Sequence, residues 1–123
     1  MLRQFVALGA CSGVLAVLLG AFGAHALRTR LTPDLLAIWQ TASQYHFYHA
    51  LALVLTGVAA ASLGSSGLLR ASGWAFLAGT LVFSGSLYLL AFTGVRWLGA
   101  ITPIGGVALI IAWALLAAAA LRA

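Results

Sequence analysis

Two histidines three residues apart are the side chains in this sequence best suited to chemistry. His46 and His49 share a helix face, because side chains three apart on a helix are neighbours. Joined by His25 from another helix, they would have the donor set that zinc or copper uses. Asp34 is the one carboxylate available to orient such a ligand, and H-x-x-H is a common pattern. Structural hydrogen bonding, contact with a metal or cofactor, and contact with a proton or polar ligand all stay open. We assign no metal and no cofactor.

Other catalytic patterns do not occur in the sequence. With Asp34 as the one acidic residue of 123, the chain lacks the paired carboxylates of a glycosidase and the acidic metal cage of a phosphotransferase. No serine stands in a nucleophile-elbow pattern, and no glycine-rich loop follows a strand. We therefore predict no catalytic residue and a protein that is not an enzyme.

The composition indicates that most side chains are surrounded by lipid rather than water. Hydrophobic residues make up 64% of the chain and charged residues only 6%. The surface of a soluble domain needs roughly a quarter to a third of charged residues. The lipid bilayer is therefore the first predicted partner of this protein.

Four apolar stretches are long enough to cross a bilayer, whose hydrocarbon core takes about 20 helical residues. They predict an all-α integral membrane bundle of four transmembrane helices, folded as one domain over residues 1–123. The predicted spans cover about residues 5–27, 45–63, 73–93 and 104–121.

The second helix is predicted to begin before its span. Thr32, Pro33 and Asp34 combine an N-cap, a first-turn proline and a carboxylate at the positive end of a helix, so they predict a start at Pro33. Residues 33–44 are amphipathic and are predicted to form an interfacial helix. This segment either continues into the span or is set off from it by a bend.

Counting depth along four antiparallel spans predicts that polar side chains gather at one end of the bundle. Both termini share one membrane face, and the three histidines and Asp34 fall near the other. The third span contributes hydroxyl groups near the same face. The sequence therefore predicts a shallow polar pocket, with the candidate residues His25, Tyr45, His46, His49, Ser84, Ser86 and Tyr88.

Small residues recur along the first span at spacings of three and four. Gly9, Gly13 and Gly20 are predicted to form a face that a second helix approaches closely, as is usual in lipid. Packing against a neighbouring span of the same chain is favoured over a dimer interface.

The net charge of +5 comes from arginines at the ends of the apolar stretches, where they mark loops beside lipid headgroups rather than a nucleic-acid site. The arginine count leaves the orientation tied at three to three, with a slight preference for cytoplasmic termini from the N-terminal amine, and a dual-topology dimer stays open. The two sets are Arg3, Arg70 and Arg122 on the terminal face, and Arg28, Arg30 and Arg96 on the other.

Several motifs resemble a known bacterial family. They are GAFGAHALR (20–28), W-x-T-A-x-x-Y-H-x-Y-H-A-L-A-L (39–53), G-x-x-x-F-S-G-S-L-Y (79–88) and I-T-P-I-G-G (101–106). The chain resembles the YgdD/YwdK-type small inner-membrane proteins, a family of unknown function with a mitochondrial transmembrane branch in eukaryotes. The resemblance implies a four-span, multi-pass protein of the bacterial inner membrane, and it brings no established catalytic residues.

These observations favour a non-enzymatic accessory protein or small subunit of a larger membrane complex, or a homo-oligomer. One alternative is a small transporter or channel that uses the histidine and tyrosine cluster. Another is a redox component that contacts a metal or a quinone.

Overall fold

The computed structural model describes residues 2–123, and its regular elements in that range are all helices. Four long helices form the fold: α1 (Arg3–His25), α2 (Pro33–Leu63), α3 (Gly67–Thr93) and α4 (Thr102–Arg122). A short 3₁₀ helix, η1 (Arg96–Ala100), precedes α4. All four long helices have the length and hydropathy needed to cross a membrane, which confirms the predicted all-α, four-helix membrane fold.

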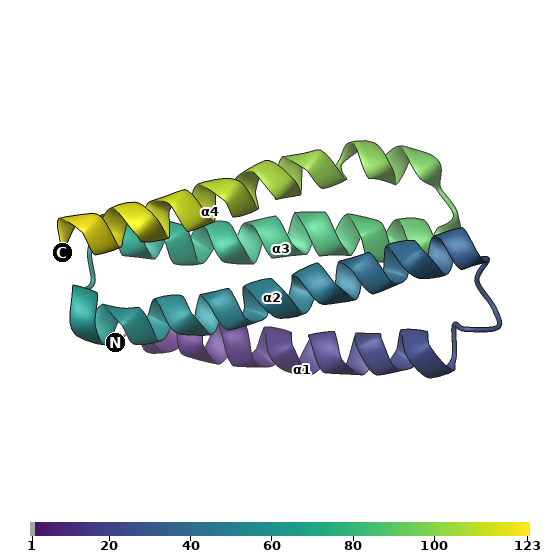
Figure 1. Ribbon diagram of the computed structural model, residues 1–123, viewed down its shortest axis with the longest axis horizontal. Helices are drawn as coiled ribbons and strands as arrows, with labels where there is room; N and C mark the ends of the chain where they lie inside the picture. The colour runs from purple at the N-terminus through teal and green to yellow at the C-terminus, as the bar shows by residue number, and fades with distance from the viewer. Residues whose placement is uncertain (1) are drawn as a thin grey trace.

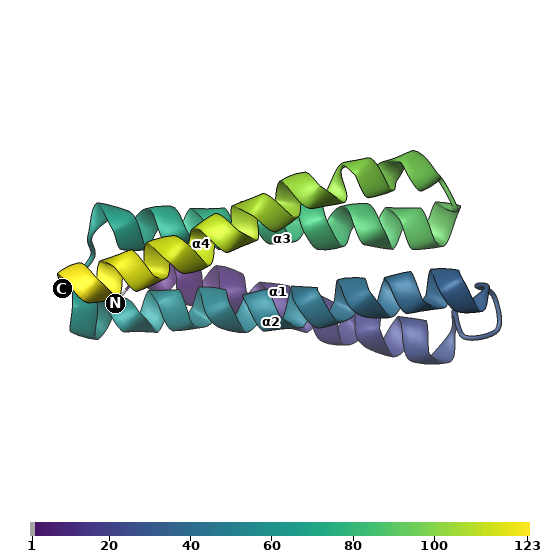
Figure 2. The same cartoon turned by 45° about the horizontal axis from the view of Figure 1, so that its top comes forward.

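The helices are stacked in chain order, with α2 and α3 in the middle and α1 and α4 outside (Figure 1). Packing is extensive between α1 and α2, between α2 and α3, and between α3 and α4, whereas α1 and α4 do not pack on each other. Figure 2 shows both termini at one end of the bundle and the α1–α2 connection at the other. The two central helices are therefore more buried than the two outer ones.

Helix α2 begins where the sequence predicts. The Thr32 side chain caps it by accepting a hydrogen bond from Leu35 N, and Pro33 and Asp34 occupy its first turn. The helix then continues unbroken to Leu63, so the amphipathic segment and the following apolar stretch are continuous. With a rise of about 1.5 Å per residue, α2 is longer than the roughly 30 Å hydrocarbon core.

The segment predicted to lie at the interface is packed along α1. Trp39 is 5% exposed, and its Nε1 donates to Leu19 O at 2.9 Å. Its indole also covers Gly23, where a Cβ would have no room. The apolar side of the amphipathic pattern thus faces other helices, and the position of the lipid boundary along α2 stays a prediction.

Helix α3 begins at Gly67, ahead of residue 73, where the predicted span starts. Ser66 caps it by accepting from Leu69 N at 3.2 Å. The connection between α2 and α3 is short and turns at Gly64, whose φ of 81° favours glycine. The helix ends at Gly94, which has a left-handed φ of 73°.

The face of α1 that meets α2 repeats every seven residues, and this corrects the predicted packing stripe. Gly9 packs on Ala50 and Val54, but Gly13 and Gly20 face open space. Alternating steps of three and four keep a seam in register with a neighbouring helix, as in coiled coils. The seam consists of Leu2, Phe5, Gly9, Ser12, Ala16, Leu19 and Gly23.

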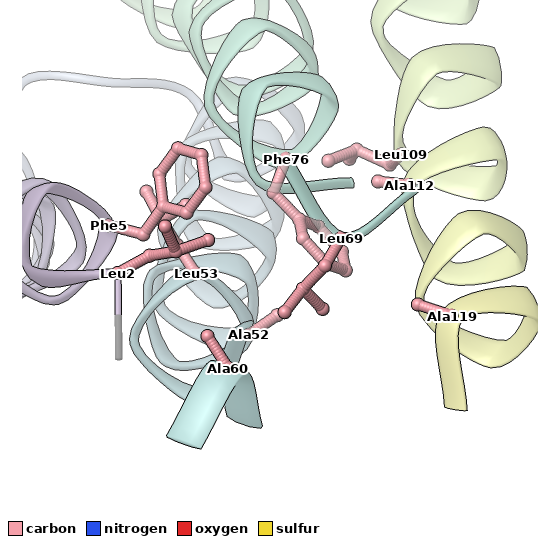
Figure 3. Close-up of a cluster of buried hydrophobic side chains, with 10 residues drawn as sticks. All are labelled: Leu2, Phe5, Ala52, Leu53, Ala60, Leu69, Phe76, Leu109, Ala112 and Ala119. Atoms are coloured by element: carbon pink, nitrogen blue, oxygen red, sulfur yellow. The ribbon is translucent and has the colours of Figure 1, made fainter. Parts of the chain in front are cut away.

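Two apolar clusters hold the ends of the bundle together. The larger lies toward the termini and includes Phe5 from α1, Leu53 from α2, Phe76 from α3 and Leu109 from α4 (Figure 3). The smaller is built on Leu27, Trp39 and Ala91 at the opposite end. Along their helices, His46 and Ser84 therefore lie between the two apolar clusters.

An ion pair joins two loops at the end away from the termini. Arg96 Nη2 donates to Asp34 Oδ2 at 2.8 Å, and both side chains are exposed. The Thr32 hydroxyl also donates to the Asp34 carboxylate. These two hydrogen bonds, that of Thr32 first, lower the pKa of Asp34 from 3.8 to about 2.

The close approach of α1 to α2 predicts that alanine at two glycines of α1 has different effects on the stability of the fold. A Cβ at Gly9 would lie 2.6 Å from Val54 Cγ2 and 2.8 Å from Val54 N, so Gly9→Ala should destabilise the fold by about 1–3 kcal/mol. Gly13→Ala should leave stability equal or slightly higher, since its Cβ meets nothing within 4 Å. Reversible unfolding in mixed SDS micelles measures both, and equal stability of the two variants would contradict this helix register.

Titration of Asp34 tests the hydrogen bonds at the opposite end. Because the folded pKa is depressed, the stabilisation is present above the unfolded pKa of 3.8 and is lost as pH falls through about 2. Thr32→Val and Arg96→Gln should each raise the pKa of Asp34, since each removes a hydrogen bond that lowers it. Carboxyl ¹³C NMR reports the pKa directly, and an unchanged pKa in either variant would show that the hydrogen bond it removes does not act on Asp34.

Candidate functional site

His46 hydrogen-bonds to groups on two other helices, so it joins α1, α2 and α3. Its Nδ1 lies 2.9 Å from Tyr88 Oη on α3, and its Nε2 lies 3.0 Å from Ser12 Oγ on α1. The side chain is only 7% exposed. Both polar atoms of the imidazole are therefore satisfied inside the protein.

Two further hydroxyl groups extend this cluster. Tyr88 Oη is 3.4 Å from Ser43 Oγ, and Ser84 Oγ donates to Ala42 O at 2.9 Å. A neutral imidazole has one donor and one acceptor nitrogen. The chain from Ser12 through His46 to Tyr88 therefore has two possible proton arrangements, and which one it adopts depends on the tautomer.

His49 faces the other outer helix. Trp113 Nε1 on α4 donates to His49 Nε2 at 3.1 Å, so that nitrogen is an acceptor. The proton of a neutral ring then lies on Nδ1, which donates to Tyr45 O at 2.7 Å. Phe76 and Trp113 also lie against the ring, with centroids 6.0 Å away. This contact fixes one tautomer of His49 and ties α2 to α4.

Both histidines lie about halfway along the bundle, not at its end as depth counting predicts. Ser12 is well inside α1 (Arg3–His25), and Trp113 is well inside α4 (Thr102–Arg122). The prediction placed the start of the second span at Tyr45, but α2 packs on its neighbours from its first turns onward. The imidazoles therefore lie deep among apolar segments, where polar groups are costly unless paired.

The structure separates the predicted pocket residues into groups. His46, Ser84 and Tyr88 share the α1–α3 side, and Tyr45 and His49 share the α4 side.

The other two predicted residues join neither group. Ser86 pairs with Thr102, at 2.6 Å between the hydroxyl oxygens. His25 is exposed at the end of α1, about 20 Å along the helix axis from Ser12 by the helical rise. Across residues 2–123 no three histidine, cysteine, aspartate or glutamate side chains lie close enough to hold a metal ion.

Four residues that lie around the two histidines are not among the predicted site residues: Ser12, Ser43, Thr80 and Trp113. Ser12 is the polar position in the seven-residue seam of α1, and that repeat is the sequence signal for it. Thr80 looks like an ordinary hydroxyl bonded to its own helix, and it does donate to Phe76 O at 2.7 Å. Trp113 lies in an apolar stretch of α4, and no local pattern pairs it with His49.

A cavity of about 340 Å³ lies between α1 and α3, beside His46. Five leucines of the two helices form its apolar wall, including the exposed Leu15 and Leu81. Its polar lining comes from hydroxyl and imidazole groups on three helices. These groups belong to Ser12, His46, Thr80, Ser84 and Tyr88.

Sequence comparisons relate the chain to membrane proteins. The family model described as "Protein of unknown function (DUF423)" matches residues 19–106. The UPF0382 membrane protein YwdK of Bacillus subtilis is 46% identical over 121 residues, which cover 98% of each chain. A UPF0382 membrane protein of Staphylococcus epidermidis is 44% identical over 98% of each chain. One from Staphylococcus aureus is 43% identical over 94% of this chain and 93% of its own. No solved structure matches this chain.

The bond between His46 and Tyr88 predicts a measurable coupling between α2 and α3. In a double-mutant cycle of His46→Leu and Tyr88→Phe, the coupling energy should be about 0.6 kcal/mol and at most about 1.7, the range for interhelical hydrogen bonds in membranes. Tyr48→Phe is the matched control, because Tyr48 is 54% exposed and its hydroxyl takes no part in the hydrogen bonds of the His46 cluster. Unfolding in mixed micelles measures each variant. Strict additivity of His46→Leu and Tyr88→Phe would show that this hydrogen bond does not stabilise the fold.

Proposed function

We propose that this membrane protein, which belongs to the DUF423 family, is a non-enzymatic accessory subunit of a larger membrane complex. The observation that carries the proposal is the use of both histidines as connections between helices. His46 and His49 each have both ring nitrogens in hydrogen bonds within the protein. Side chains engaged in this way stabilise helix positions, which supports a structural role for the most polar part of the bundle.

The open arrangement of the helices supports assembly with a partner. Helices α1 and α4 do not pack on each other, so each has a wide face directed away from the bundle. On α1 that face includes Gly13 and Gly20, where an added Cβ meets nothing within 4 Å. Small residues at such positions let another helix come close in lipid, where packing replaces the hydrophobic effect as the driving force. The partner that fits this face is an apolar transmembrane helix of another protein.

The same helices support a location in the bacterial inner membrane, with several spans. Apolar helices of this length match the hydrocarbon core, whereas outer-membrane proteins of bacteria are built as β-barrels. The relatives in Bacillus and Staphylococcus are named membrane proteins.

Replacement of one outward glycine tests the subunit proposal. The chain, tagged and expressed at its natural level, should copurify from mild detergent with a membrane protein in constant stoichiometry. Gly13→Leu should reduce that recovery at least fivefold, because the leucine would keep the partner helix from approaching α1 closely. The fold should keep its stability, because a side chain at residue 13 meets no other part of this chain within 4 Å of its Cβ. Quantitative mass spectrometry of the purified complex gives the ratio.

Ile110→Leu on α4 is the matched control, since Ile110 is 71% exposed and the change conserves volume. Recovery of the wild-type chain as a lone monomer would contradict the proposal. A complex that contains only copies of this chain would replace it with a homo-oligomer.

A further inference from the structure

We propose that the cavity between α1 and α3 binds an uncharged lipid through a free hydroxyl group. The bound molecule places its hydrocarbon part along the leucine walls and its hydroxyl against the polar side chains beside His46. This site is independent of the subunit role, because it lies between two helices of one chain rather than on their outward faces.

The cavity opens sideways, toward the lipid. Its lining residues come from the interiors of α1, α2 and α3, not from the loops at either end. Leu15 and Leu81 at its edges are 54% and 66% exposed. A volume of about 340 Å³ lies within the usual range of ligand pockets, roughly 300–1,000 Å³. A ligand dissolved in the bilayer can therefore enter without passing through water.

The chemistry of the lining selects an uncharged head group. Among residues 2–123, no arginine, aspartate or other charged side chain lines the cavity. A charged head group that moved from water into this cavity would find no counter-charge there, and an unpaired charge among transmembrane helices is costly. Polar side chains from three helices still converge there, and polar groups among transmembrane segments tend to be functional.

The hydroxyl groups of the lining further select a hydrogen-bond donor. Thr80 Oγ1 already donates its proton to Phe76 O at 2.7 Å, and Ser84 Oγ donates to Ala42 O at 2.9 Å. Each oxygen keeps lone pairs that accept hydrogen bonds. Both residues line the cavity, so their oxygens are acceptors at its wall. A ligand hydroxyl donates its one proton to either oxygen, whereas an ether or a hydrocarbon has no proton to donate.

Gly85 keeps the cavity open. It lines the cavity on α3 between Leu81 and Tyr88, and a Cβ at this position would meet nothing within 4 Å. A large side chain at residue 85 can therefore fill the space without a backbone clash. Gly13 also has space for a larger side chain, but it does not line the cavity. Its replacement is therefore a matched control for the replacement of Gly85.

Photolabelling of the purified protein tests the site. In phosphatidylcholine nanodiscs, a diazirine-bearing dodecanol should label the walls around Leu8, Cys11 and Leu77, as mapped by peptide mass spectrometry. The methyl ether of the same probe has the same tail and lacks the donor. We expect labelling by the alcohol to exceed that by the ether at least fivefold at these residues, close to the value of one hydrogen bond.

Three variants separate the contributions. Gly85→Leu should reduce alcohol labelling at least tenfold, and Gly13→Leu should leave it unchanged. Thr80→Val keeps the shape of the side chain and removes one acceptor, so it should lower alcohol labelling twofold to fivefold and leave ether labelling unchanged. If Gly85→Leu does not fold, Thr80→Val alone decides the outcome.

Competition identifies the source of the hydroxyl. Displacement of the probe by dioleoylglycerol indicates a glycerolipid alcohol, and displacement by farnesol indicates an isoprenoid alcohol. Failure of both, equal labelling by alcohol and ether, or full labelling of Gly85→Leu would overturn the proposal. The two proposals can fail independently of each other. Gly13→Leu should lose the partner and keep the alcohol site, whereas Gly85→Leu should lose the alcohol site and keep the partner.

Discussion

The fold depends on satisfying polar side chains where water is scarce. A hydroxyl or imidazole left unpaired among apolar helices is costly, since lipid offers no hydrogen bonds. Within residues 2–123, every buried side-chain nitrogen and oxygen has a hydrogen-bond partner. The bonds of His46 to Ser12 and Tyr88 require α1, α2 and α3 to hold one relative register. A slip of α1 by one residue would break the contact to Ser12 and bury an unpaired ring nitrogen.

Close packing enforces the same register by a different means. Gly9 and Gly57 let α1 and α2 approach until a Cβ on either would collide with the other helix, and Gly105 does the same for α4 against Phe83 of α3. Glycine weakens a helix in water, but in lipid the gain from close contact compensates. Each outer helix is thus held mainly by one neighbour, which explains how a bundle without contact between α1 and α4 can keep its shape.

The sequence predicts the helices far better than which of their turns lie side by side. Apolar length indicates four spans, and Thr32, Pro33 and Asp34 indicate the start of α2, because both signals are local. The place of His46 depends instead on which turn of α1 and α3 lies beside it, and that is decided by long-range packing. The short, amphipathic appearance of residues 33–44 hides the burial of Trp39, which Leu19 and Gly23 of another helix cover. The grouping of seven pocket residues fails for the same reason: proximity along a helix does not say which neighbour each side chain faces.

The two histidines differ in what surrounds them, and that difference decides which hydroxyl groups lie beside each ring. His49 meets the indole of Trp113, which occupies its acceptor nitrogen. The groove beside it is lined by aromatic, aliphatic and glycine residues, with no serine or threonine among the described residues there. His46 instead meets the small side chain of Ser12, which lines a cavity together with Thr80 and Ser84. Two histidines three residues apart on one helix thus have different surroundings. Trp113 covers the ring of His49, whereas His46 adjoins a cavity lined by hydroxyl groups. A structural histidine and a ligand site can then coexist, because the imidazole holds the helices while the hydroxyl oxygens keep their lone pairs.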